Sequence, residues 1–432
     1  MTAVTVISFR FRIQRVWRAG SSGRSTDLFR RRSCWRPSSR SKKARSFAGI
    51  SKCSALWPRA DAVRVGLNAT CFNERPSGAN QRFAGIYGAL IARCPDIEFV
   101  IFEPADCRVA QWFGDAPNVT VRRTPMPSTG RIRRALGGLA YWRRALAKEK
   151  LDLFETFHLP LLRAPRCPTI LTVHDARPIL RDVPLVKRLL YGRILSTGLR
   201  RADHVITVSE TMRQEILGIE SRASVSAIYN GIDPKPFERI DVAEAEATRA
   251  RLHLPSRFVL AVGHLEGRKN YPRLVEAIAR LRAAGEDIAL VIVGNEGGDG
   301  AAIADQIRNL HLQDHVRLLQ GVSHAELTHI YALAALVAFP STYEGFGIPI
   351  LEAMAARRPL VVSGTPVFRE LTEGRGIYFP PDDVDAMAAA ISGVLSSAER
   401  QQALIDYGER RIQDFRFPAL AEQVEQAYRA LA

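Results

Sequence analysis

Short apolar segments alternate with helical patterns along both halves of this chain, and no other feature constrains its fold as much. In the first half these segments are residues 63–67, 97–102, 119–121, 151–154, 169–173 and 204–208. In the second half they are residues 258–262, 288–294, 316–322, 335–339, 359–362 and 376–379. Several are apolar almost throughout, which is typical of parallel strands buried on both faces. The alternation predicts an α/β fold with two parallel, doubly wound sheets, which bind ligands beyond the carboxyl ends of their strands.

The boundary between the two series of strands is marked by residues 228–233, which Pro234 and Pro236 follow closely. This pattern predicts a strand, a turn and an exit from a first domain. We expect a first domain over residues 62–235, a second over 256–416 and a final helix over 417–432. A chain of 432 residues that is 47% hydrophobic can bury cores for both domains.

The net charge of +17 comes mainly from residues 1–60, which hold 15 Lys and Arg against one acid, Asp27. The rest of the chain carries 46 basic and 43 acidic residues, so it is nearly neutral. A nucleic-acid-binding domain would show a basic face on its folded part, and we therefore expect no nucleic-acid partner. The tail is rich in Arg and Ser without lasting periodicity, which predicts disorder. It could be a transit-like or membrane-surface segment, a nucleic-acid arm, or residues upstream of the functional start, and we favour the last.

Two absences in the sequence bear on location. Residues 4–11 are too short and too interrupted by Arg for a secretory signal, and no run of about 18 apolar residues occurs to span a membrane. The six cysteines show no metal-binding spacing, so we expect reduced thiols in a cytoplasmic protein. They are Cys34, Cys53, Cys71, Cys94, Cys107 and Cys167.

The segment 341–355, STYEGFGIPILEAMA, predicts a ligand site. It follows a buried strand and leads into a helix whose first turn suits Pro349. Unpaired amides and the helix dipole at such a junction favour an anion. Glu344 and Glu352 flank the junction and could each bind a vicinal diol, and phosphates with diols indicate a nucleotide sugar. If the two glutamates stood alone, we would instead expect Glu352 to interact with the helix dipole and Glu344 to be solvated, with no ligand involved.

With GFGIP between these glutamates, the segment resembles the Glu-x7-Glu element of the retaining glycosyltransferases of family 4, which commonly reads EGFGxPxxEAMA. The resemblance extends over about residues 63–432. It implies the GT-B fold, in which two Rossmann-like domains face a cleft and the last helix crosses back to the first domain. It also implies that Glu352 binds the ribose, that Glu344 contacts the sugar, and that Gly345, Phe346 and Gly347 bind the donor.

Two motifs of the first half resemble the same family. TVHD places His174 where relatives bind the transferred sugar. Without this motif, we would interpret His174 as a structural or simply exposed residue. The loop at Gly78 is similar to the glycine loop that faces the donor phosphates, with a helix expected over residues 83–93. Asn80 and Gln81 stand where a second glycine is common. NGID at residues 230–233 resembles the hinge between the domains.

In the second half, Arg268 and Lys269 follow a predicted strand in a sequence that resembles the family's RKN motif. No metal-binding DxD motif is apparent, and residues 382–385 are better interpreted as a helix cap. Fixed cations must then neutralise the leaving diphosphate, and we expect no metal and no cofactor. Gly321 lies in the turn where relatives hold the nucleobase. The role of His264 stays open.

Residues 131–150 carry seven basic residues and one acid, with Ile132, Leu136, Leu139 and Leu146 roughly on one side. Such a helix could lie on an anionic membrane, as basic helices of resembling enzymes do, and Arg131, Arg133 and Arg134 would make that contact. The alternative, which we favour slightly, is that the apolar side packs on the first sheet.

We therefore expect a retaining, metal-independent hexosyltransferase that uses a nucleotide-diphosphate sugar. Its acceptor would be a saccharide or a lipid-linked saccharide of surface polysaccharide or glycolipid synthesis. TVHD and the glycine loop resemble mannosyl- or rhamnosyl-transferring members. The location would be the cytoplasm, with possible contact to the inner face of the membrane. The alternatives are a nucleotide-sugar epimerase of the same architecture and a non-enzymatic adaptor that acts through the basic tail.

Overall fold

The computed structural model describes residues 63–75, 77–162, 166–176 and 184–431; side chains of residues 131–137, 139 and 140 are outside this description. The predicted disordered tail, residues 1–60, lies outside it as well, with Cys34 and Cys53. The other four cysteines are free thiols, as predicted, and burial raises the pKa of Cys94 to about 12.

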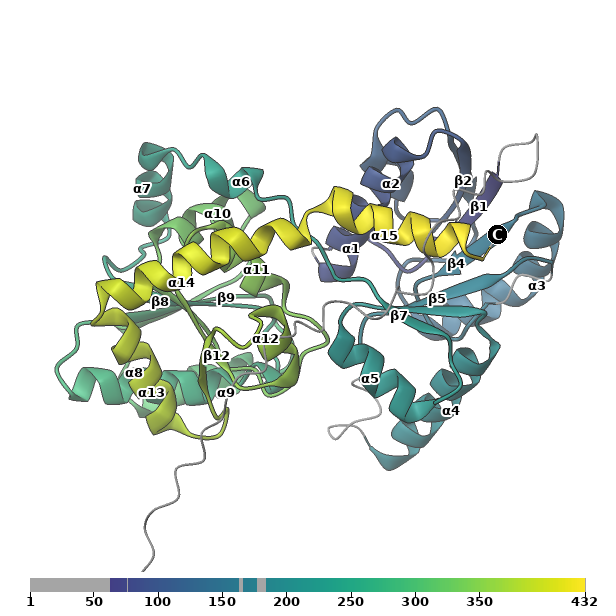
Figure 1. Cartoon of the computed structure of the whole chain (residues 1–432). Coiled ribbons are helices and arrows are strands. Elements are labelled where there is room, and N and C mark those ends of the chain that lie inside the picture. Colours follow the sequence, from purple (N-terminus) through teal and green to yellow (C-terminus); the bar gives the residue numbers. More distant parts are fainter. Residues whose placement is uncertain (1–62, 76, 163–165, 177–183, 432) are drawn as a thin grey trace, which may run out of the picture. The chain divides into compact units, whose positions relative to one another are not determined.

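Seven strands form the first sheet, in the order β3-β2-β1-β4-β5-β6-β7 (Figure 1). They are β1 (Val63–Asn68), β2 (Ile97–Glu103), β3 (Val119–Arg123), β4 (Leu153–Thr156), β5 (Thr169–Val173), β6 (His204–Thr207) and β7 (Val225–Ala227). All neighbouring pairs are parallel, as the apolar segments predicted. The order reverses between β1 and β4, which is the point where such sheets bind ligands.

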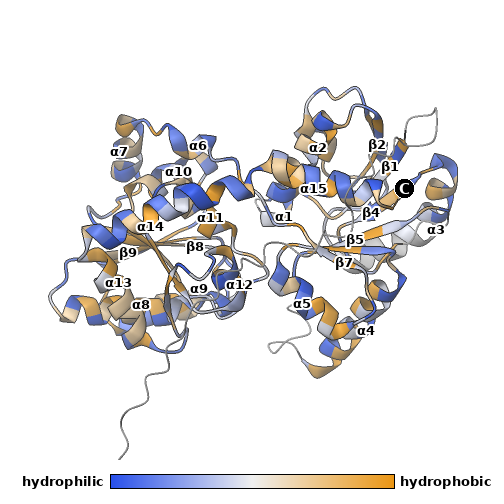
Figure 2. Cartoon of the chain, in the orientation of Figure 1, coloured by the Kyte–Doolittle hydropathy of each residue, from blue (hydrophilic) through white to orange (hydrophobic). Residues whose placement is uncertain are grey.

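The second sheet has six parallel strands in the order β10-β9-β8-β11-β12-β13. They are β8 (Phe258–Val262), β9 (Ala289–Val293), β10 (Val316–Leu319), β11 (Leu336–Phe339), β12 (Leu360–Ser363) and β13 (Ile377–Phe379). Both faces are covered, because Phe258 and Leu260 belong to one hydrophobic cluster and Val259 and Ala261 to another. Figure 2 shows hydrophobic colours along β5 and β8. The order reverses between β8 and β11, so the loops that follow these two strands lie side by side.

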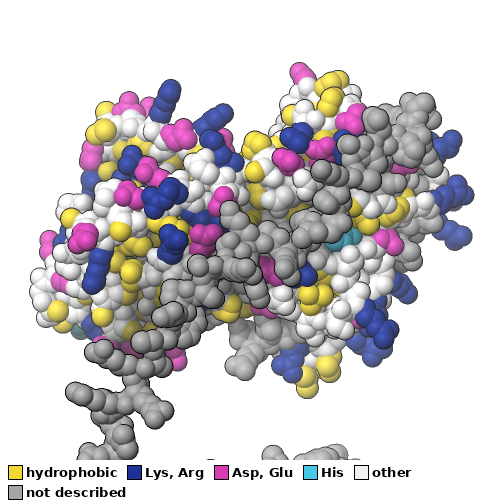
Figure 3. Space-filling model, in the orientation of Figure 1, with side chains coloured by type: hydrophobic (Ala, Val, Ile, Leu, Met, Phe, Trp, Pro, Cys, Tyr) yellow, Lys and Arg dark blue, Asp and Glu magenta, His cyan; other side chains and the backbone are white. Residues whose placement is uncertain are grey.

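Helices cover the sheets, and the predicted two-sheet α/β architecture is confirmed. Around the first sheet they are α1 (Gly78–Arg82), a π-helical turn (Phe83–Tyr87), α2 (Gly88–Arg93), a 3-10 turn (Val109–Phe113), α3 (Arg131–Glu149), α4 (Leu185–Arg201) and α5 (Glu210–Ile219). The others are α6 (Lys235–Glu238), α7 (Val242–Arg251), a 3-10 turn (Gly267–Lys269), α8 (Tyr271–Ala283), α9 (Gly300–Asn309), α10 (His324–Leu333), α11 (Ile348–Ala355), α12 (Pro366–Leu371), α13 (Val384–Leu395), α14 (Ala398–Arg411), a 3-10 turn (Ile412–Phe415) and α15 (Phe417–Arg429). In the view of Figure 3, Lys and Arg are interspersed with Asp and Glu over the helices of the second half.

The last helix returns to the first sheet, as the family resemblance implied. A Cβ on Gly85 would lie 2.2 Å from the Phe417 ring, so only glycine lets α15 pack here. At the other end of α15, the Tyr428 hydroxyl donates a hydrogen bond to the buried Glu155 carboxylate. The two connecting segments run side by side, since the Ile232 amide donates to the Phe415 carbonyl at 2.9 Å.

One local difference from the expectations has a clear cause. The helix predicted over residues 83–93 begins at Gly78, because the Ser77 hydroxyl accepts a hydrogen bond from the Asn80 amide at 3.1 Å and caps it there. Gly78 and Asn80 therefore lie in a helical turn rather than in a loop. The predicted cap at residues 382–385 is confirmed, since the Asp383 side chain accepts from the Ala386 amide.

The basic helix predicted over residues 131–150 forms as α3. In its second half Trp142 and Leu146 are buried against Phe102 and Phe154, so this half packs on the sheet. The side chains of Arg131, Arg133 and Arg134, on which the membrane interpretation rested, lie outside the described residues.

Candidate functional site

Residues 336–355 form the predicted strand, loop and helix. β11 ends at Phe339 and α11 begins at Ile348, with Pro349 in its first turn. Gly347 occupies the N-cap position with φ of 128°, a backbone conformation that favours glycine, and no side chain caps the helix. Pro349 has no N–H and the Ile350 amide donates to the Gly347 carbonyl at 3.0 Å, so the Ile348 amide is the one left for a ligand or solvent in the first three residues of α11.

A cluster of charges forms where the loops after β8 and β11 meet. Lys269 Nζ lies 2.8 Å from Glu344 Oε1, and Arg268 Nη1 lies 2.5 Å from Glu344 Oε2. Ser341 donates a further hydrogen bond to Glu344 at 2.9 Å. Burial alone would raise the pKa of Glu344, but the charges of Lys269 and Arg268 outweigh it and hold this pKa below its usual range. Glu344 is thus a carboxylate at neutral pH, and Glu266 also pairs with Arg268 at 2.8 Å.

Asn270 fixes the turn that carries Arg268 and Lys269. It adopts a left-handed conformation with φ of 59°, which Asn tolerates better than most residues. Its side-chain amide donates to the carbonyls of Pro340 at 3.1 Å and Pro381 at 2.6 Å, and so ties the turn to the neighbouring loops. The RKN motif therefore combines two cations with the residue that positions them.

Glu352 lies on α11 and is 7% exposed. Burial raises the pKa of its carboxyl, while a hydrogen bond from the Tyr331 hydroxyl at 2.8 Å and the charge of Lys269 act against that rise. Lys269 therefore lies close enough to influence both glutamates of the motif. One oxygen of Glu352 is held by Tyr331, which leaves the other available to a ligand.

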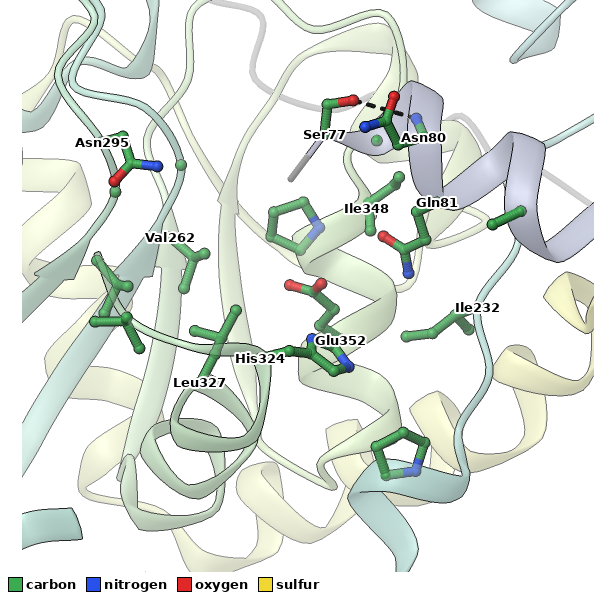
Figure 4. Close-up of a pocket in the computed structure, with 18 of the residues that line it drawn as sticks. Ser77, Asn80, Gln81, Ile232, Val262, Asn295, His324, Leu327, Ile348 and Glu352 are labelled. Atoms are coloured by element: carbon green, nitrogen blue, oxygen red, sulfur yellow. Dashed lines mark hydrogen bonds between the residues drawn. The ribbon is translucent and has the colours of Figure 1, made fainter. Parts of the chain in front are cut away.

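A cavity of about 1000 Å³ lies next to this cluster. Its lining includes the predicted donor-binding residues Gly78, Gly321 and Glu352 and comes from both halves of the chain (Figure 4). In Figure 4 the Glu352 carboxylate points into the space between Ile348 and His324, with Asn295 on another wall. A cavity of this size accommodates a nucleotide sugar.

The predicted Lys269 and Glu344 are not among the described residues that line this cavity. Lys269 lies directly behind its wall, because a Cβ on Gly263 would be 2.7 Å from Lys269 Nζ and Gly263 lines the cavity. Only glycine, here with φ of 144°, lets the ammonium come this near. The structure thus brings Lys269, Glu344 and Glu352 together at one edge of the second sheet.

His174 follows β5 and meets the motif loop. A Cβ on Gly345 would lie 2.3 Å from the His174 carbonyl oxygen, so the two backbones are in contact. His174 is partly exposed as a residue, but its Nε2 is buried and has no hydrogen-bond partner among the described residues. Burial and the charge of Arg82 lower the pKa of His174 to about 3, which makes the ring neutral.

Two predicted donor-binding residues make contacts of another kind. Phe346 is 4% exposed and packs against Tyr229 and Phe415, so its side chain belongs to the core between the connecting segments. The Gly345 carbonyl accepts a hydrogen bond from Ser209 at 2.9 Å. For these two residues, only the amide groups are left to face a donor.

Several cavity residues were not predicted from the sequence. Asn295 and His324 line the cavity, and no role was predicted for them; Gln81, noted above only because it replaces a glycine, lines it as well. His264, whose role was open, also lines it, whereas Arg268 is occupied by two carboxylates. These cavity residues share a position just after a strand or in the first turn of a helix, at the carboxyl edges of the sheets, and this position is the sequence signal that could have identified them.

The described part of the chain lacks two kinds of feature. No group of three or more His, Cys, Asp and Glu side chains in these residues is arranged to hold a metal ion. None of the described helices is long and apolar enough to cross a membrane.

Two family models match the chain. Residues 76–235 match "Glycosyltransferase Family 4", and residues 244–411 match "Glycosyl transferases group 1". Neither describes an epimerase, so the epimerase alternative gains no support.

Relatives and solved structures agree with these models. The chain is 31% identical to the O-antigen chain mannosyltransferase RfbU of Salmonella typhimurium, over 59% of this chain and 69% of the relative. It is 25% identical to the serotype-specific mannosyltransferase WbdA of Escherichia coli, over 55% of this chain but only 31% of that protein. The fold is similar to sucrose-phosphate synthase from Thermosynechococcus elongatus, with a TM-score of 0.70, 24% identity, and coverage of 85% of this chain and 99% of that one. It is also similar to Anabaena HepE in complex with UDP and glucose, with a TM-score of 0.67, 19% identity, and coverage of 85% and 100%. With its motifs, its two sheets and these matches, the chain belongs to the family-4 glycosyltransferases and is a hexosyltransferase of the GT-B fold.

Proposed function

We propose that this protein transfers a hexose of the mannose or rhamnose type from a nucleotide-diphosphate sugar to a saccharide or lipid-linked acceptor. The transfer retains the anomeric configuration and uses no metal ion. The observation that carries the proposal is the cluster of Lys269, Arg268 and Glu344 beside a large cavity into which Glu352 points. A diphosphate is bound by cations, and the hydroxyl groups of a ribose and a sugar are bound by hydrogen-bond acceptors such as carboxylates.

The donor lies in the cavity with its nucleoside toward Gly321 and its sugar toward His174. Glu352 accepts hydrogen bonds from the ribose diol through the oxygen that Tyr331 leaves available. The diphosphate meets the Ile348 amide at the start of α11 and the ammonium of Lys269, where the helix dipole adds to the attraction. The nucleobase meets mainly backbone atoms near Gly321, so the sequence does not reveal which base is bound.

Glu344 keeps Lys269 in place and neutralises part of its charge before the donor binds. The charges of Lys269, Arg268, Glu344 and Glu266 sum to zero, so an empty site holds no unpaired charge in low dielectric. An incoming diphosphate then shares Lys269 with Glu344. Glu344 acts by orienting this cation and by contacting the sugar hydroxyls.

In the transfer step, the bond between the anomeric carbon and the diphosphate oxygen breaks. The acceptor oxygen forms its bond to the same carbon from the same face, and its proton passes to an oxygen of the leaving diphosphate. Lys269 and the Ile348 amide stabilise the charge that develops on this leaving group. The neutral His174 supports the sugar by hydrogen bonding and adds no positive charge beside the oxocarbenium-like carbon.

The choice of sugar and acceptor rests on the relatives. RfbU and WbdA are mannosyltransferases, and the first is named for the O-antigen chain. A surface polysaccharide built on a lipid carrier is the matching acceptor class, and the cytoplasm or the cytoplasmic face of the membrane is the matching location. A nucleic-acid partner is not part of this proposal.

Incubation with GDP-, UDP-, ADP- and dTDP-sugars in the presence of EDTA tests the proposal. The wild type should bind one of them, seen as a rise in melting temperature, and hydrolyse it slowly when no acceptor is present. Lys269→Met should lower the melting temperature of the free protein, because it leaves the buried cluster with a net negative charge, and should show neither the donor-induced rise nor the hydrolysis. Failure of all four donors, or hydrolysis that EDTA abolishes, would overturn it.

A further inference from the structure

We propose that Tyr343 is a positioning residue, which sets Glu344 and His174 relative to each other across the two halves of the chain. Tyr343 lies in the loop after β11, directly before Glu344. Its ring packs against a hydrophobic cluster of the first half that contains Val173 and Met212. A side chain of the second half thus extends into the core of the first half, next to the segment that carries His174.

The Tyr343 hydroxyl has two partners in the first half. It donates a hydrogen bond to Glu215 Oε2 at 2.9 Å, and it is hydrogen-bonded to the main chain of Ala176, two residues after His174. Burial raises the pKa of Glu215, and the bond from Tyr343 acts against that rise. The hydroxyl therefore joins the loop that carries Glu344 both to α5 and to the segment that carries His174.

The residue on the other side of Glu344 is held from the same helix. The Gly345 carbonyl accepts a hydrogen bond at 2.9 Å from Ser209, which is the N-cap residue of α5. Glu344 is therefore flanked on both sides by residues that are bonded to α5 or to its cap. Lys269 fixes the carboxylate of Glu344 from the second half, whereas these two bonds fix its main chain from the first half.

Glu370 makes a third connection to α5. It lies in α12 of the second half, and its carboxylate accepts hydrogen bonds from the amides of Glu210 at 2.6 Å and Thr211 at 2.7 Å. These amides begin α5, where the helix dipole favours a negative charge. The Thr211 hydroxyl donates to the same carboxylate at 2.6 Å. A carboxylate of one half thus caps a helix of the other, and Figure 1 shows α5 and α12 side by side.

These contacts connect the geometry of the site with the contact between the halves. In the proposed function, the donor sugar lies between His174 and Glu344, so a shift of one relative to the other misaligns the reacting atoms. A displacement of this kind lowers turnover steeply. The groups proposed to bind the nucleotide, Glu352 and Lys269, both belong to the second half and are not shifted. The effect on turnover rests on the proposed function, whereas the fixing of the loop by Tyr343 does not.

Kinetics of Tyr343→Phe test this role, because the change removes the hydroxyl and keeps the ring. Its control is Tyr407→Phe, which removes a hydroxyl that donates to Glu373 Oε2 at 3.4 Å within the second half. We expect kcat of donor hydrolysis to fall about tenfold or more in Tyr343→Phe and to stay as in the wild type in the control. Calorimetric titration with GDP, UDP, ADP and dTDP should find an unchanged Kd for whichever of them the wild type binds.

Two further variants address the partners of the loop. Glu215→Ala should lower kcat as Tyr343→Phe does, and the double variant should lose little more, because both changes remove the same bond. Glu370→Gln should also lower kcat, since its amide nitrogen is a donor and cannot accept from the amides of α5. The exposed Glu373 lies three residues further on, and Glu373→Gln is the control with the same change of charge.

Hydrogen exchange of the free protein separates positioning from general destabilisation and needs no activity. Residues 341–347 should exchange faster in Tyr343→Phe and Glu370→Gln, while β8 and β9 keep their wild-type rates. Faster exchange throughout the second half, or wild-type exchange in both variants, would overturn the proposal. So would a local rise in variants that keep wild-type kcat. If exchange rises locally while no form of the protein hydrolyses any donor, the fixing of the loop stands and the proposed reaction fails.

Discussion

Lys269 Nζ lies 2.8 Å from Glu344 Oε1, although 75 positions separate the two residues in the sequence. They meet because one follows β8 and the other follows β11, and these strands are neighbours where the order of the second sheet reverses. The reversal leaves a space beyond the strands, and the charged pair stands at its edge. The topology of the sheet thus assembles the site.

The first prediction concerns this pair. Glu344→Gln and Lys269→Met should each lower turnover by about two orders of magnitude or more, because each removes an aligned charge that the transition state uses. The double variant should lose much less than the product of the two effects, since the residues act as one unit. Steady-state kinetics with the best donor provide the measurement. Wild-type turnover in either single variant, or fully multiplicative losses, would contradict the assignment.

The second prediction concerns Glu352. Glu352→Gln should weaken donor binding about tenfold or more, because hydrogen bonds to a charged acceptor contribute more than those to a neutral one. Tyr331 can still donate to the amide oxygen, so the melting temperature should change little. Calorimetric titration with the donor and with its free nucleoside diphosphate measures the loss. A role at the ribose requires the same loss for both ligands, and a loss for the sugar nucleotide alone would place Glu352 at the sugar instead.

The third prediction concerns the contact between Gly345 and His174. Gly345→Ala would bring a Cβ to 2.3 Å from the His174 carbonyl oxygen. Relief of this clash requires a shift of the main chain, which costs more free energy than a side-chain rotation. We expect about 1–3 kcal/mol of lost stability, the usual cost of overpacking, together with reduced transfer. Gly218→Ala is the control, because nothing lies within 4 Å of its Cβ position in α5. Chemical denaturation should show this control unchanged or stabilised, and equal behaviour of the two variants would argue against the contact.

The fourth prediction is a dependence of stability on pH. The pKa of His174 is about 3 in the folded protein against 6.5 ordinarily, so between these values the unfolded chain binds a proton that the folded protein does not. The stability that the folded protein gains from holding this ring neutral is therefore fully present above pH 6.5 and is lost as the pH falls toward 3. In His174→Gln the slope of unfolding free energy against pH should be lower by up to about 1.4 kcal/mol per pH unit in this window. Urea denaturation from about pH 6 to about pH 4 measures the slope. Parallel lines for the wild type and His174→Gln would contradict a buried neutral ring.

Much of the fold could be predicted because buried parallel strands leave a strong sequence pattern. The thirteen strands of the structure fall at or near apolar segments of the sequence, apart from the short β7. Part of the site could be predicted from the sequence because Lys269, Glu344 and Glu352 lie in motifs at the ends of strands or the start of a helix. The start of α1 was missed because the capping hydroxyl of Ser77 precedes a glycine, which by itself indicates a loop.

Other features depend on tertiary contacts that no local pattern contains. Phe346 looks like part of the ligand loop, but its ring packs against Tyr229 at the junction of the two halves. The pairing of Arg268 with two carboxylates needs Glu266 and Glu344 to come from different loops. The first two turns of α4 have the composition of a buried helix, and only the structure shows that their apolar side chains are exposed.

The central claim is retaining transfer from a diphosphate held by Lys269 and its partners without a metal ion. The most direct measurement follows hydrolysis of a nucleotide hexose labelled with ¹³C at the anomeric carbon, by NMR, in EDTA and without acceptor. Before mutarotation sets in, the account predicts release of the hexose with the anomeric configuration of the donor, and no such release by Glu344→Gln. Release of the inverted anomer first, or hydrolysis that requires an added divalent ion, would contradict it.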